Sequence, residues 1–579
     1  MRTFLALLLT CSWAIAPWAG PTAQADVIAQ GDVTPDTDPD LPIFGGTASE
    51  EILVGITGTG RLTIDVPSFT APLISPGAQI GDELTGIGEA LVSGLNSEWE
   101  IQGEFIVGDN GLAFLSLVGG AQVVSTLFDD GMGMTVDASM TIGKEATSQG
   151  YVSIDGFGSR LDTSGLLTIA DEGVAQIDIT NRGNMLTTGS ATMGITTNTS
   201  PPTTLNPSAT VTLRDLGSRW IIQENLTVGN EGADGETVFS LLEIGEQSLV
   251  QVGEQLDINL RGRIDFDGGT LRTLDPTFTI ENDGVILGGG VIQGSILNGG
   301  RGEIRNAADI ASLRQNLIIT GEVENSGLIE SLGGEMEFQS VVTNELEIVA
   351  RDAVMRFSGG LVNDISGDII LGGDTTLHSI GTILSEGGIH VLTGSEALII
   401  GDLTFTGAAS VANALTLAAG DSTGTLDVAG TIDLGSALLE LDYSAGVASQ
   451  VGDTYQILSS TEPIVGMFSN LANEVIADGR IWDIIYGTSS VSVTATGATV
   501  STMPGDFNGD GICDGADFLV WQAGAGTIYD GNDLADWENC MLSPAVVAAS
   551  AAVPEPSSGL LLVLGSLLIG AGTLGRKRR

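Results

Sequence analysis

A twelve-residue stretch, residues 506–517, places oxygen-bearing side chains at the spacing that a bound calcium ion requires. Calcium takes six to eight hard oxygen ligands. A loop of this length supplies them from positions 1, 3, 5, 9 and 12 and from the backbone carbonyl of position 7, with a glycine at position 6 for the sharp turn. The predicted ligands are Asp506, Asn508, Asp510, Ile512, Asp514 and Asp517. The sequence therefore predicts a Ca²⁺ site, and the alternative is an acidic, glycine-rich turn that binds no ion.

The residues after this loop extend the prediction to a small helical module over residues 504–541. An aspartate at position 12 followed by the helical run Phe518–Trp521 resembles the type I dockerin repeat more closely than a complete EF-hand. Dockerins carry two such loops and bind a cohesin-like partner. Here residues 530–537 match only residues 514–521, the second half of the first copy. The resemblance implies a calcium-binding module and leaves two roles open, docking to a cohesin-like protein or a calcium-stabilised spacer.

The module also contains the two cysteines that remain after removal of the N-terminal segment, Cys513 and Cys540. In an oxidising compartment they are candidates for a disulfide between the first loop and the second helix. The alternative is two buried thiols that do not meet.

The N-terminal end predicts export. Arg2 precedes an apolar run, and Ala23-Gln24-Ala25 gives the small-x-small pattern that signal peptidase accepts, so residues 1–25 are expected to be removed. An uncleaved membrane anchor is the alternative, but the apolar stretch is short and contains Pro17.

The C-terminal end, residues 553–579, predicts a sorting signal. The motif Val553, Pro554, Glu555 and Pro556 precedes the apolar segment 559–575 and a tail of four basic residues. Such a segment is just long enough for a transmembrane helix with its cations in the cytoplasm. The three parts together resemble the PEP-CTERM signal, which implies recognition by an exosortase, transient membrane anchoring and association with exopolysaccharide. An ordinary transmembrane helix is the alternative.

The charge of the chain excludes nucleic acid as a partner. Five of the 20 basic residues lie in the two processed ends, which leaves 15 against 73 acidic residues, or about −58. Such a field repels phosphate and suits solubility and divalent cations.

The long middle of the chain, residues 50–434, predicts a β-solenoid. Short alternating apolar runs are separated by Gly, Asn and Asp, with almost no helical periodicity. Trp99, Leu161 and Trp220 occupy equivalent places, as do Val54, Val107, Ile169 and Val228, which are 53, 62 and 59 residues apart. We expect each repeat to span about three coils of roughly 20 residues, and some 20 coils to form a rod on the order of 100 Å long. β-Sandwiches would not explain tandem repetition.

These repeats, and the strands expected over residues 435–498, resemble autotransporter passenger regions. That resemblance implies an all-β fold, a right-handed parallel β-helix with a β-rich C-terminal cap. The full predicted organisation is a signal peptide (1–25), a linker (26–49), the solenoid (50–434), the cap (435–498), the calcium module (504–541), a second linker (542–552) and the sorting signal (553–579).

The function that this organisation predicts is structural or adhesive, at the outer cell surface or in the extracellular matrix, in contact with polysaccharide. A polysaccharide lyase or hydrolase on the same solenoid is the rival. Arg261, Arg263, Asp265 and Asp267 share one strand face and offer paired carboxylates for acid–base chemistry, but a solvated row of neutralising charges is the expected reading. His378 and His390 lack metal-ligand spacing and are expected at the surface or at corners. We therefore predict no catalytic residue.

Overall fold

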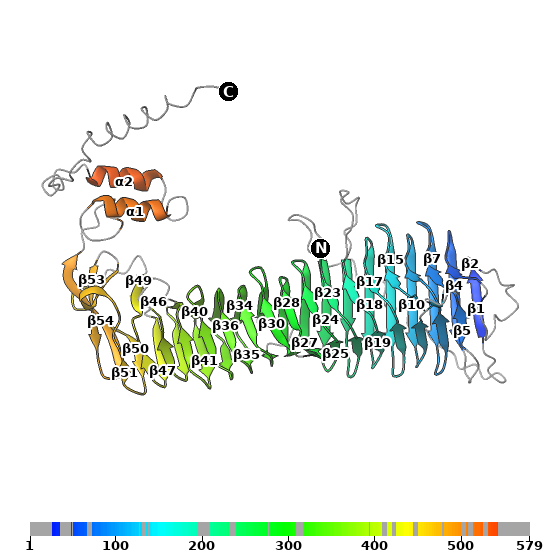
Figure 1. The fold of residues 1–579 in the computed structure, drawn as a ribbon, viewed down its shortest axis with the longest axis horizontal. Helices are drawn as coiled ribbons and strands as arrows, with labels where there is room; N and C mark the ends of the chain where they lie inside the picture. The colour runs from blue at the N-terminus through cyan, green and yellow to red at the C-terminus, as the bar shows by residue number, and fades with distance from the viewer. Residues whose placement is uncertain are drawn as a thin grey trace, which may run out of the picture.

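The described part of the chain forms a long rod of stacked β-strands with two helices beyond one end (Figure 1). The computed structural model describes residues 26–34, 48, 50–65, 72–126, 128–129, 135–136, 138–194, 208–230, 239–275, 277–307, 316–392, 394–407, 414–419, 424–443, 450–477, 480–499, 505, 507, 513–524 and 531–541. The signal peptide and the sorting signal, including Val553, Pro554, Glu555 and Pro556, lie outside these residues. No helix among the described residues is long and apolar enough to cross a membrane.

The rod is a parallel β-helix of sixteen coils, each built from three strands or strand segments that pair with the next coil. At about 4.8 Å per coil the stack is roughly 80 Å long. This arrangement confirms the predicted parallel β-solenoid, although it has fewer coils than expected.

The first face consists of short strands. They are β3 (Ile52–Val54), β6 (Ala78–Ile80), β9 (Phe105–Val107), β14 (Met140–Ile142), β17 (Leu167–Ile169), β20 (Ala191–Met193), β23 (Leu226–Val228), β26 (Leu256–Ile258), β28 (Thr279–Asn282), β30 (Ser295–Asn298), β33 (Val323–Asn325), β36 (Val342–Asn344), β39 (Leu361–Asn363), β42 (Ile383–Ser385), β45 (Leu403–Phe405), β48 (Ile432–Asp433) and β51 (Ile464–Val465).

The second face carries longer strands. They are β4 (Thr59–Asp65), β7 (Ile87–Ser93), β10 (Leu112–Val118), β15 (Gln149–Asp155), β18 (Val174–Thr180), β21 (Ser208–Leu213), β24 (Phe239–Gly245), β27 (Gly262–Thr273), β29 (Val285–Gln293), β31 (Glu303–Ala307), β34 (Leu328–Leu332), β37 (Glu347–Arg351), β40 (Asp368–Gly372), β43 (Gly388–Val391), β46 (Ala414–Ala419) and β49 (Leu438–Tyr443).

The third face includes the second halves of β27 and β29. Its other strands are β5 (Leu73–Ser75), β8 (Glu98–Ile101), β11 (Gln122–Ser125), β16 (Arg160–Thr163), β19 (Asn184–Thr187), β22 (Arg219–Ile222), β25 (Leu249–Val252), β32 (Asn316–Ile319), β35 (Glu335–Phe338), β38 (Val354–Phe357), β41 (Asp374–Ser379), β44 (Glu396–Ile400), β47 (Thr425–Ala429) and β50 (Thr454–Ser460). A short hairpin, β12 (Phe128–Asp129) and β13 (Thr135–Val136), lies between β11 and β14.

Apolar side chains alternate inward along each strand and stack on their equivalents in the next coil, which builds one continuous core. The equivalent positions that the sequence identified lie in such stacks. Val54 and Val107 share the first-face stack, but Ile80 lies between them in its own coil. Likewise Val123 separates Trp99 from Leu161, and Met185 separates Leu161 from Trp220. Each sequence repeat therefore spans two coils of 24 to 35 residues, and the expectation of three short coils was wrong because long turns contribute to each coil.

In the C-terminal half of the rod, this first-face stack changes from aliphatic to amide side chains. Five buried asparagines follow Ile258 in register, and each donates a hydrogen bond from Nδ2 to the side-chain oxygen of the next residue, at 2.6–3.0 Å. We call this set the asparagine ladder: Asn282, Asn298, Asn325, Asn344 and Asn363, with Ser385 as the last acceptor.

Antiparallel strands cover both ends of the rod. β1 (Asp26–Gly31) pairs with β4, and β2 (Val33–Thr34) pairs with β3. Residues 26–34 are therefore an N-terminal cap, and their assignment to a linker was wrong. The first coil needs this cap because an open sheet edge exposes unpaired N–H and C=O groups.

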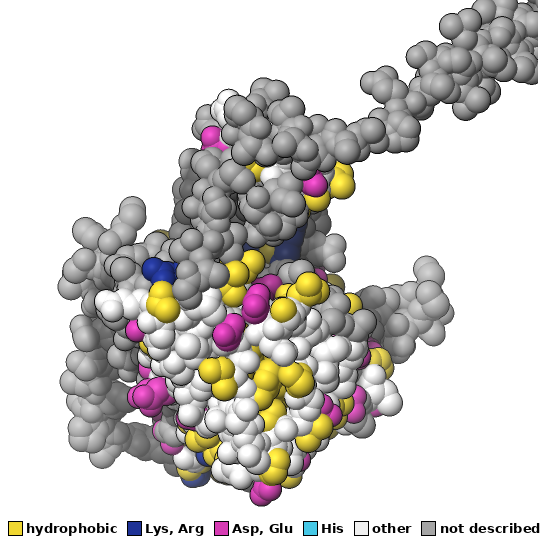
Figure 2. All heavy atoms as spheres, turned by 90° about the vertical axis from the view of Figure 1, so that its left-hand side faces the viewer, with side chains coloured by type: hydrophobic (Ala, Val, Ile, Leu, Met, Phe, Trp, Pro, Cys, Tyr) yellow, Lys and Arg dark blue, Asp and Glu magenta, His cyan; other side chains and the backbone are white. Residues whose placement is uncertain are grey.

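At the other end, β52 (Glu474–Ala477), β53 (Arg480–Tyr486) and β54 (Ser490–Thr499) form an antiparallel sheet with β50 around the buried Trp482. A single turn of 3₁₀-helix, Leu471–Asn473, precedes β52. Parallel pairing continues through β49 and β50, so the antiparallel cap begins after the predicted residue 435. Figure 2 looks onto this end and shows apolar side chains on the end face with acidic ones among them.

Two helices follow the cap, α1 (Gly515–Gly524) and α2 (Gly531–Met541). They pack against each other through three aromatic rings. The Phe518 ring lies 4.9 Å from that of Trp537 and 5.6 Å from that of Trp521, measured between centroids. This pair of helices is the module in which the sequence predicts a calcium loop.

Candidate functional site

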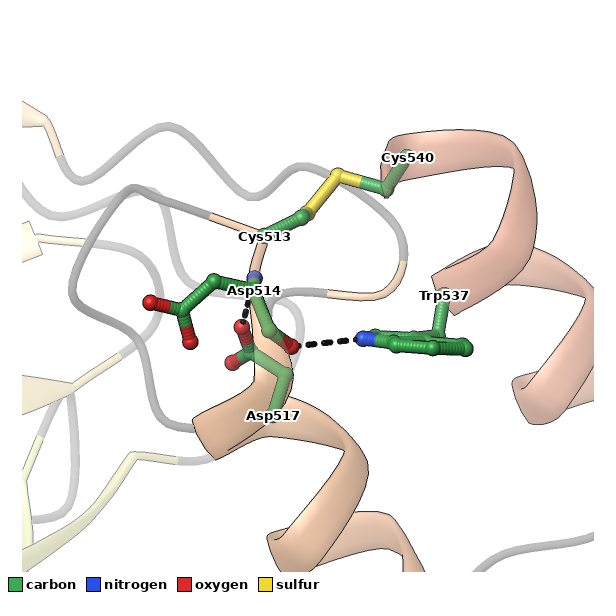
Figure 3. The surroundings of a disulfide bond; sticks show 5 residues. All are labelled: Cys513, Asp514, Asp517, Trp537 and Cys540. Atoms are coloured by element: carbon green, nitrogen blue, oxygen red, sulfur yellow. Dashed lines mark hydrogen bonds between the residues drawn. A yellow bond between two sulfur atoms is a disulfide. The ribbon is translucent and has the colours of Figure 1, made fainter. Parts of the chain in front are cut away.

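The start of α1 holds two of the predicted calcium ligands, Asp514 and Asp517 (Figure 3). Asp517 is buried and accepts a hydrogen bond at Oδ2 from the backbone N–H of Asp514, at 2.8 Å. Asp514 is exposed, and its Oδ1 accepts from the backbone N–H of Ala516 at 2.7 Å, as in an N-terminal helix cap. The backbone carbonyl of Asp514 accepts a hydrogen bond from Trp537 Nε1 at 2.8 Å, which ties the end of the loop to α2.

The other predicted ligands, Asp506, Asn508, Asp510 and Ile512, lie outside the described residues. Among the residues that the structure describes, no group of three or more His, Cys, Asp or Glu side chains is arranged to hold a metal ion. The two aspartates that are described fit a cation site in chemistry, because both offer carboxylate oxygens, the ligands that calcium prefers.

The two cysteines of the module are bonded to each other. The Cys513–Cys540 disulfide joins the end of the loop to the last turn of α2, with 5.9 Å between the two Cα atoms, and both residues are buried. A helix pair of this size buries too little apolar surface to be stable alone, so a covalent link of this kind is a large part of its stability.

A second candidate is a groove on the second face of the rod, where the sequence located its only paired carboxylates. The groove has a volume of about 630 Å³. Its polar walls come from β21, β24, β27 and the turns that follow β21 and β24; they are Thr212, Arg214, Asp215, Glu243, Glu246, Gln247, Asp265 and Asp267. As expected, Ile264 and Phe266 point into the core on the opposite face of β27.

Two carboxylates of this groove, those of Asp265 and Glu243, are held by arginines. Asp265 is buried and accepts two hydrogen bonds from the Arg263 guanidinium, at 2.5 Å from Nε and 2.7 Å from Nη2. Burial raises the pKa of Asp265, while the hydrogen bond and charge of Arg263 oppose that rise. In the preceding coil, Glu243 Oε2 accepts from Arg214 Nη2 at 3.0 Å and from Thr212 Oγ1 at 3.2 Å.

Asp265 and Glu243 are each ion-paired with an arginine and are not arranged as a catalytic acid–base pair. A glycosidase needs two carboxylates free to exchange protons and to flank a sugar. Here both carboxylates accept hydrogen bonds from cations on their own or a neighbouring strand. Asp267 lies exposed at the same groove, two residues after Asp265 on the same strand face, and Arg261 comes just before β27. The row is therefore only partly a solvated face, because Asp265 is buried beside Arg263 while Asp267 is exposed.

The two histidines lie within strands rather than at corners. His378 Nδ1 is 2.7 Å from Arg356 Nη1, and His390 Nε2 is 3.1 Å from Asp368 Oδ1. They point outward from β41 and β43, on different faces of the rod. Within the described residues they are not part of a metal-ligating group.

Sequence reasoning missed a second groove, at the C-terminal ends of strands on the third face, and a row of turn tips that precede the strands of this face. The groove includes Asp162 and Ser164, and the tips are Leu95, Phe157 and Leu216. A signal was present: each tip lies two residues before a serine of the repeated motif, but apolar residues in turns resemble core residues when only the sequence is read.

No protein-family model and no curated protein matches this sequence. Among solved structures, the chain is similar to the Hap adhesin of Haemophilus influenzae, with 11% sequence identity and a TM-score of 0.21. The alignment covers 78% of this chain and 64% of that one, so this chain spans less than two thirds of the adhesin. The two chains differ too much for the likeness to extend to function.

Proposed function

We propose that this protein is an exported surface rod with a structural or adhesive role, which contacts polysaccharide outside the cell. The observation that carries the proposal is the β-helix itself: sixteen coils closed at both ends by antiparallel caps, with two arginine-held carboxylates in a groove on its second face. Such a scaffold holds its two ends a fixed distance apart and presents long outer faces, as a stalk or an adhesin requires.

The two ends of the chain support export and surface retention. The signal peptide over residues 1–25 implies the secretory pathway. The PEP-CTERM-like tail over residues 553–579 implies transient anchoring and recognition by an exosortase. The disulfide between Cys513 and Cys540 fits the oxidising conditions outside the cytoplasm.

The helical module at the end of the rod is proposed to bind Ca²⁺ through the loop 506–517. Its support is the ligand spacing in the sequence and the burial of the Asp517 carboxylate at the start of α1. Because the second loop is incomplete, a calcium-stabilised spacer is favoured over docking to a cohesin-like partner.

Calcium titration of the full-length protein, followed by calorimetry, tests the module. We expect one Ca²⁺ per chain, and roughly a 10-fold or greater loss of affinity in Asp517→Asn, since ligand-shell changes cost that much. Asp533→Asn, on α2 outside the predicted loop, is the matched control. Wild-type protein that takes up no calcium would contradict the proposal.

Incubation of the full-length protein with neutral and acidic polysaccharides tests the role of the rod. Co-sedimentation and the appearance of reducing or unsaturated sugar ends are both recorded. We expect binding without new sugar ends. Ends that accumulate with time, and that disappear in Asp265→Asn, would show a carbohydrate-active enzyme instead.

A further inference from the structure

The helical module has two matching helices but room for only one calcium loop. α1 and α2 begin at Gly515 and Gly531, which are equivalent residues of the two sequence copies. A second twelve-residue loop ending at Asp533 would have to begin at Gln522. Gln522 lies within α1, so its backbone cannot also form the start of such a loop. The second helix must therefore be fixed to the module by other links.

One face of α2 is bonded to the end of the first loop at two neighbouring points (Figure 3). Cys540 is joined by the disulfide to Cys513, and Trp537 donates from Nε1 to the backbone carbonyl of Asp514 at 2.8 Å. Residues three apart lie on the same side of a helix, so both links come from one face of α2. They act on two consecutive residues, at positions 8 and 9 of the predicted loop. The second helix therefore holds the C-terminal part of that loop.

These links also fix two of the predicted calcium ligands relative to each other. Asp514 is held at its carbonyl by Trp537, and its backbone N–H donates to Asp517 Oδ2 at 2.8 Å. Phe518 follows Asp517, and its ring lies 4.9 Å from the Trp537 ring between centroids. The buried carboxylate of Asp517 therefore keeps its place beside Asp514 while α2 stays against the end of the loop.

A loop that is partly fixed before the ion arrives binds the ion more tightly. Ordering a free loop costs conformational entropy, and this cost reduces the affinity. The disulfide lowers the cost by confining the chain between two cysteines that are 27 residues apart in sequence. Reduction restores that freedom and leaves the weaker indole bond and the ring contact to hold α2 in place. The calcium affinity should therefore depend on the state of the disulfide.

We propose that the Cys513–Cys540 disulfide and Trp537 position the calcium loop, so that oxidation strengthens Ca²⁺ binding and Ca²⁺ in turn stabilises the disulfide. The inference rests on the proposed calcium site and adds to it a dependence on redox state. In the reduction step, a small dithiol gives two electrons and two protons to the Cys513–Cys540 bond and is itself oxidised to a disulfide. Coupling is reciprocal: the factor by which oxidation raises the calcium affinity equals the factor by which calcium favours the disulfide over the two thiols.

Calorimetric calcium titration of the full-length protein, oxidised or reduced with a small dithiol, tests this proposal. We expect reduction to weaken Ca²⁺ binding about tenfold or more. The double variant Cys513→Ser/Cys540→Ser should bind as weakly as the reduced protein, and the dithiol should not change it further. Trp537→Phe keeps a ring but loses the indole donor, and it should weaken binding roughly threefold to tenfold, the effect of one hydrogen bond. Trp482→Phe is the matched control, because it loses an indole bond to the carbonyl of Ala477 in the cap and should bind Ca²⁺ like the wild type.

Redox titration in dithiol buffers, with and without saturating Ca²⁺, gives a second readout. The free thiols are counted by alkylation at each potential. If reduction weakens Ca²⁺ binding about tenfold, the midpoint potential should be about 30 mV more negative with Ca²⁺ than without it. In Trp537→Phe the disulfide should be easier to reduce than in the wild type, because one of the links that keep the two cysteines together is missing.

The results separate this linkage from the calcium site itself. Equal Ca²⁺ affinity of the oxidised and reduced proteins, with an unshifted midpoint potential, would overturn the linkage and leave the proposed calcium site intact. Oxidised protein that takes up no Ca²⁺ would overturn the calcium site together with this inference. A loss of affinity in Trp482→Phe as large as that in Trp537→Phe would refute the positioning role of Trp537.

Discussion

The first-face stack runs through both halves of the rod, but its side chains differ in chemistry between the N-terminal and C-terminal halves. From Val54 to Ile258 the first-face stack is aliphatic and is stabilised by burial of apolar surface. From Asn282 to Asn363 the same stack is a chain of amide hydrogen bonds. Both kinds of side chain fill the same corner of the coil. Only the amides also donate hydrogen bonds to backbone carbonyls there, such as those of Gly302 and Gly367.

The comparison teaches where variation is tolerated. An aliphatic stack accepts any side chain of similar volume, and Val, Ile and Met all occur in it. An amide ladder is directional, because each Nδ2 needs an acceptor in the next coil. The exposed turn tips Leu95, Phe157 and Leu216 lie on the aliphatic half, and the ladder half has coils as short as 16 to 19 residues.

The largest loss of stability should follow from placing an asparagine in the aliphatic part of the first-face stack. Ile169→Asn buries an amide among aliphatic neighbours and leaves a space, which should cost about 3–5 kcal/mol. Urea unfolding, with hydrogen exchange to locate the weakened coils, measures the loss. Ile169→Val is the control, with an expected cost of about 1 kcal/mol. A loss as small as that control would show that the two stacks are interchangeable.

The reverse change should cost somewhat less. Asn325→Leu removes the acceptor for Asn298 Nδ2 and the donor to Asn344 Oδ1, so the ladder is cut in two. We expect a loss of about 2–4 kcal/mol, because buried polar groups are left without partners. The same urea series applies, with exposed Glu324→Gln as control. A neutral result would mean that the ladder's bonds contribute little beyond side-chain volume.

The contribution of Asp162 to the pH dependence of stability should be smaller than these two effects. Burial raises the pKa of Asp162, opposed by Arg160, so its folded-state pKa lies above the ordinary 3.8. The folded chain therefore holds this proton more tightly, and the stability that this provides is present below pH 3.8 and lost as pH rises through the folded pKa. Asp162→Asn should flatten the stability profile in that window, measured by urea midpoints. Exposed Asp267→Asn is the control, and an equal flattening there would refute the assignment.

The smallest effect on stability should come from the most exposed ring. Phe157→Ala should change the free energy of unfolding by less than about 0.5 kcal/mol, because the ring makes little contact. By contrast, Phe357→Ala removes a buried ring stacked on Phe338, at 5.2 Å between centroids, and should cost about 3–5 kcal/mol. Thermal unfolding of the two variants compares them. A large loss in Phe157→Ala would show that the tip is a structural contact.

The sequence by itself determined the fold class of the rod and which residues share one stack within it. Alternation of apolar residues specified strands, and tandem recurrence of Trp99, Leu161 and Trp220 specified stacking, since residues that repeat in sequence stack in a solenoid. It also singled out Cys513 and Cys540, which are bonded in the structure. Spacing alone could not fix the number of coils per repeat, because turns of variable length obscure the return of the chain.

Only the tertiary structure decided which polar residues are buried and which apolar residues are exposed. The sequence places asparagines in turns, whereas those of the ladder are buried, and it does not single out Phe157, which is 77% exposed. Burial depends on which coil lies against a side chain, and those neighbours are 16 to 35 residues away along the chain. For the same reason Asp265, an outward residue on β27, is buried beside Arg263 rather than free for acid–base chemistry.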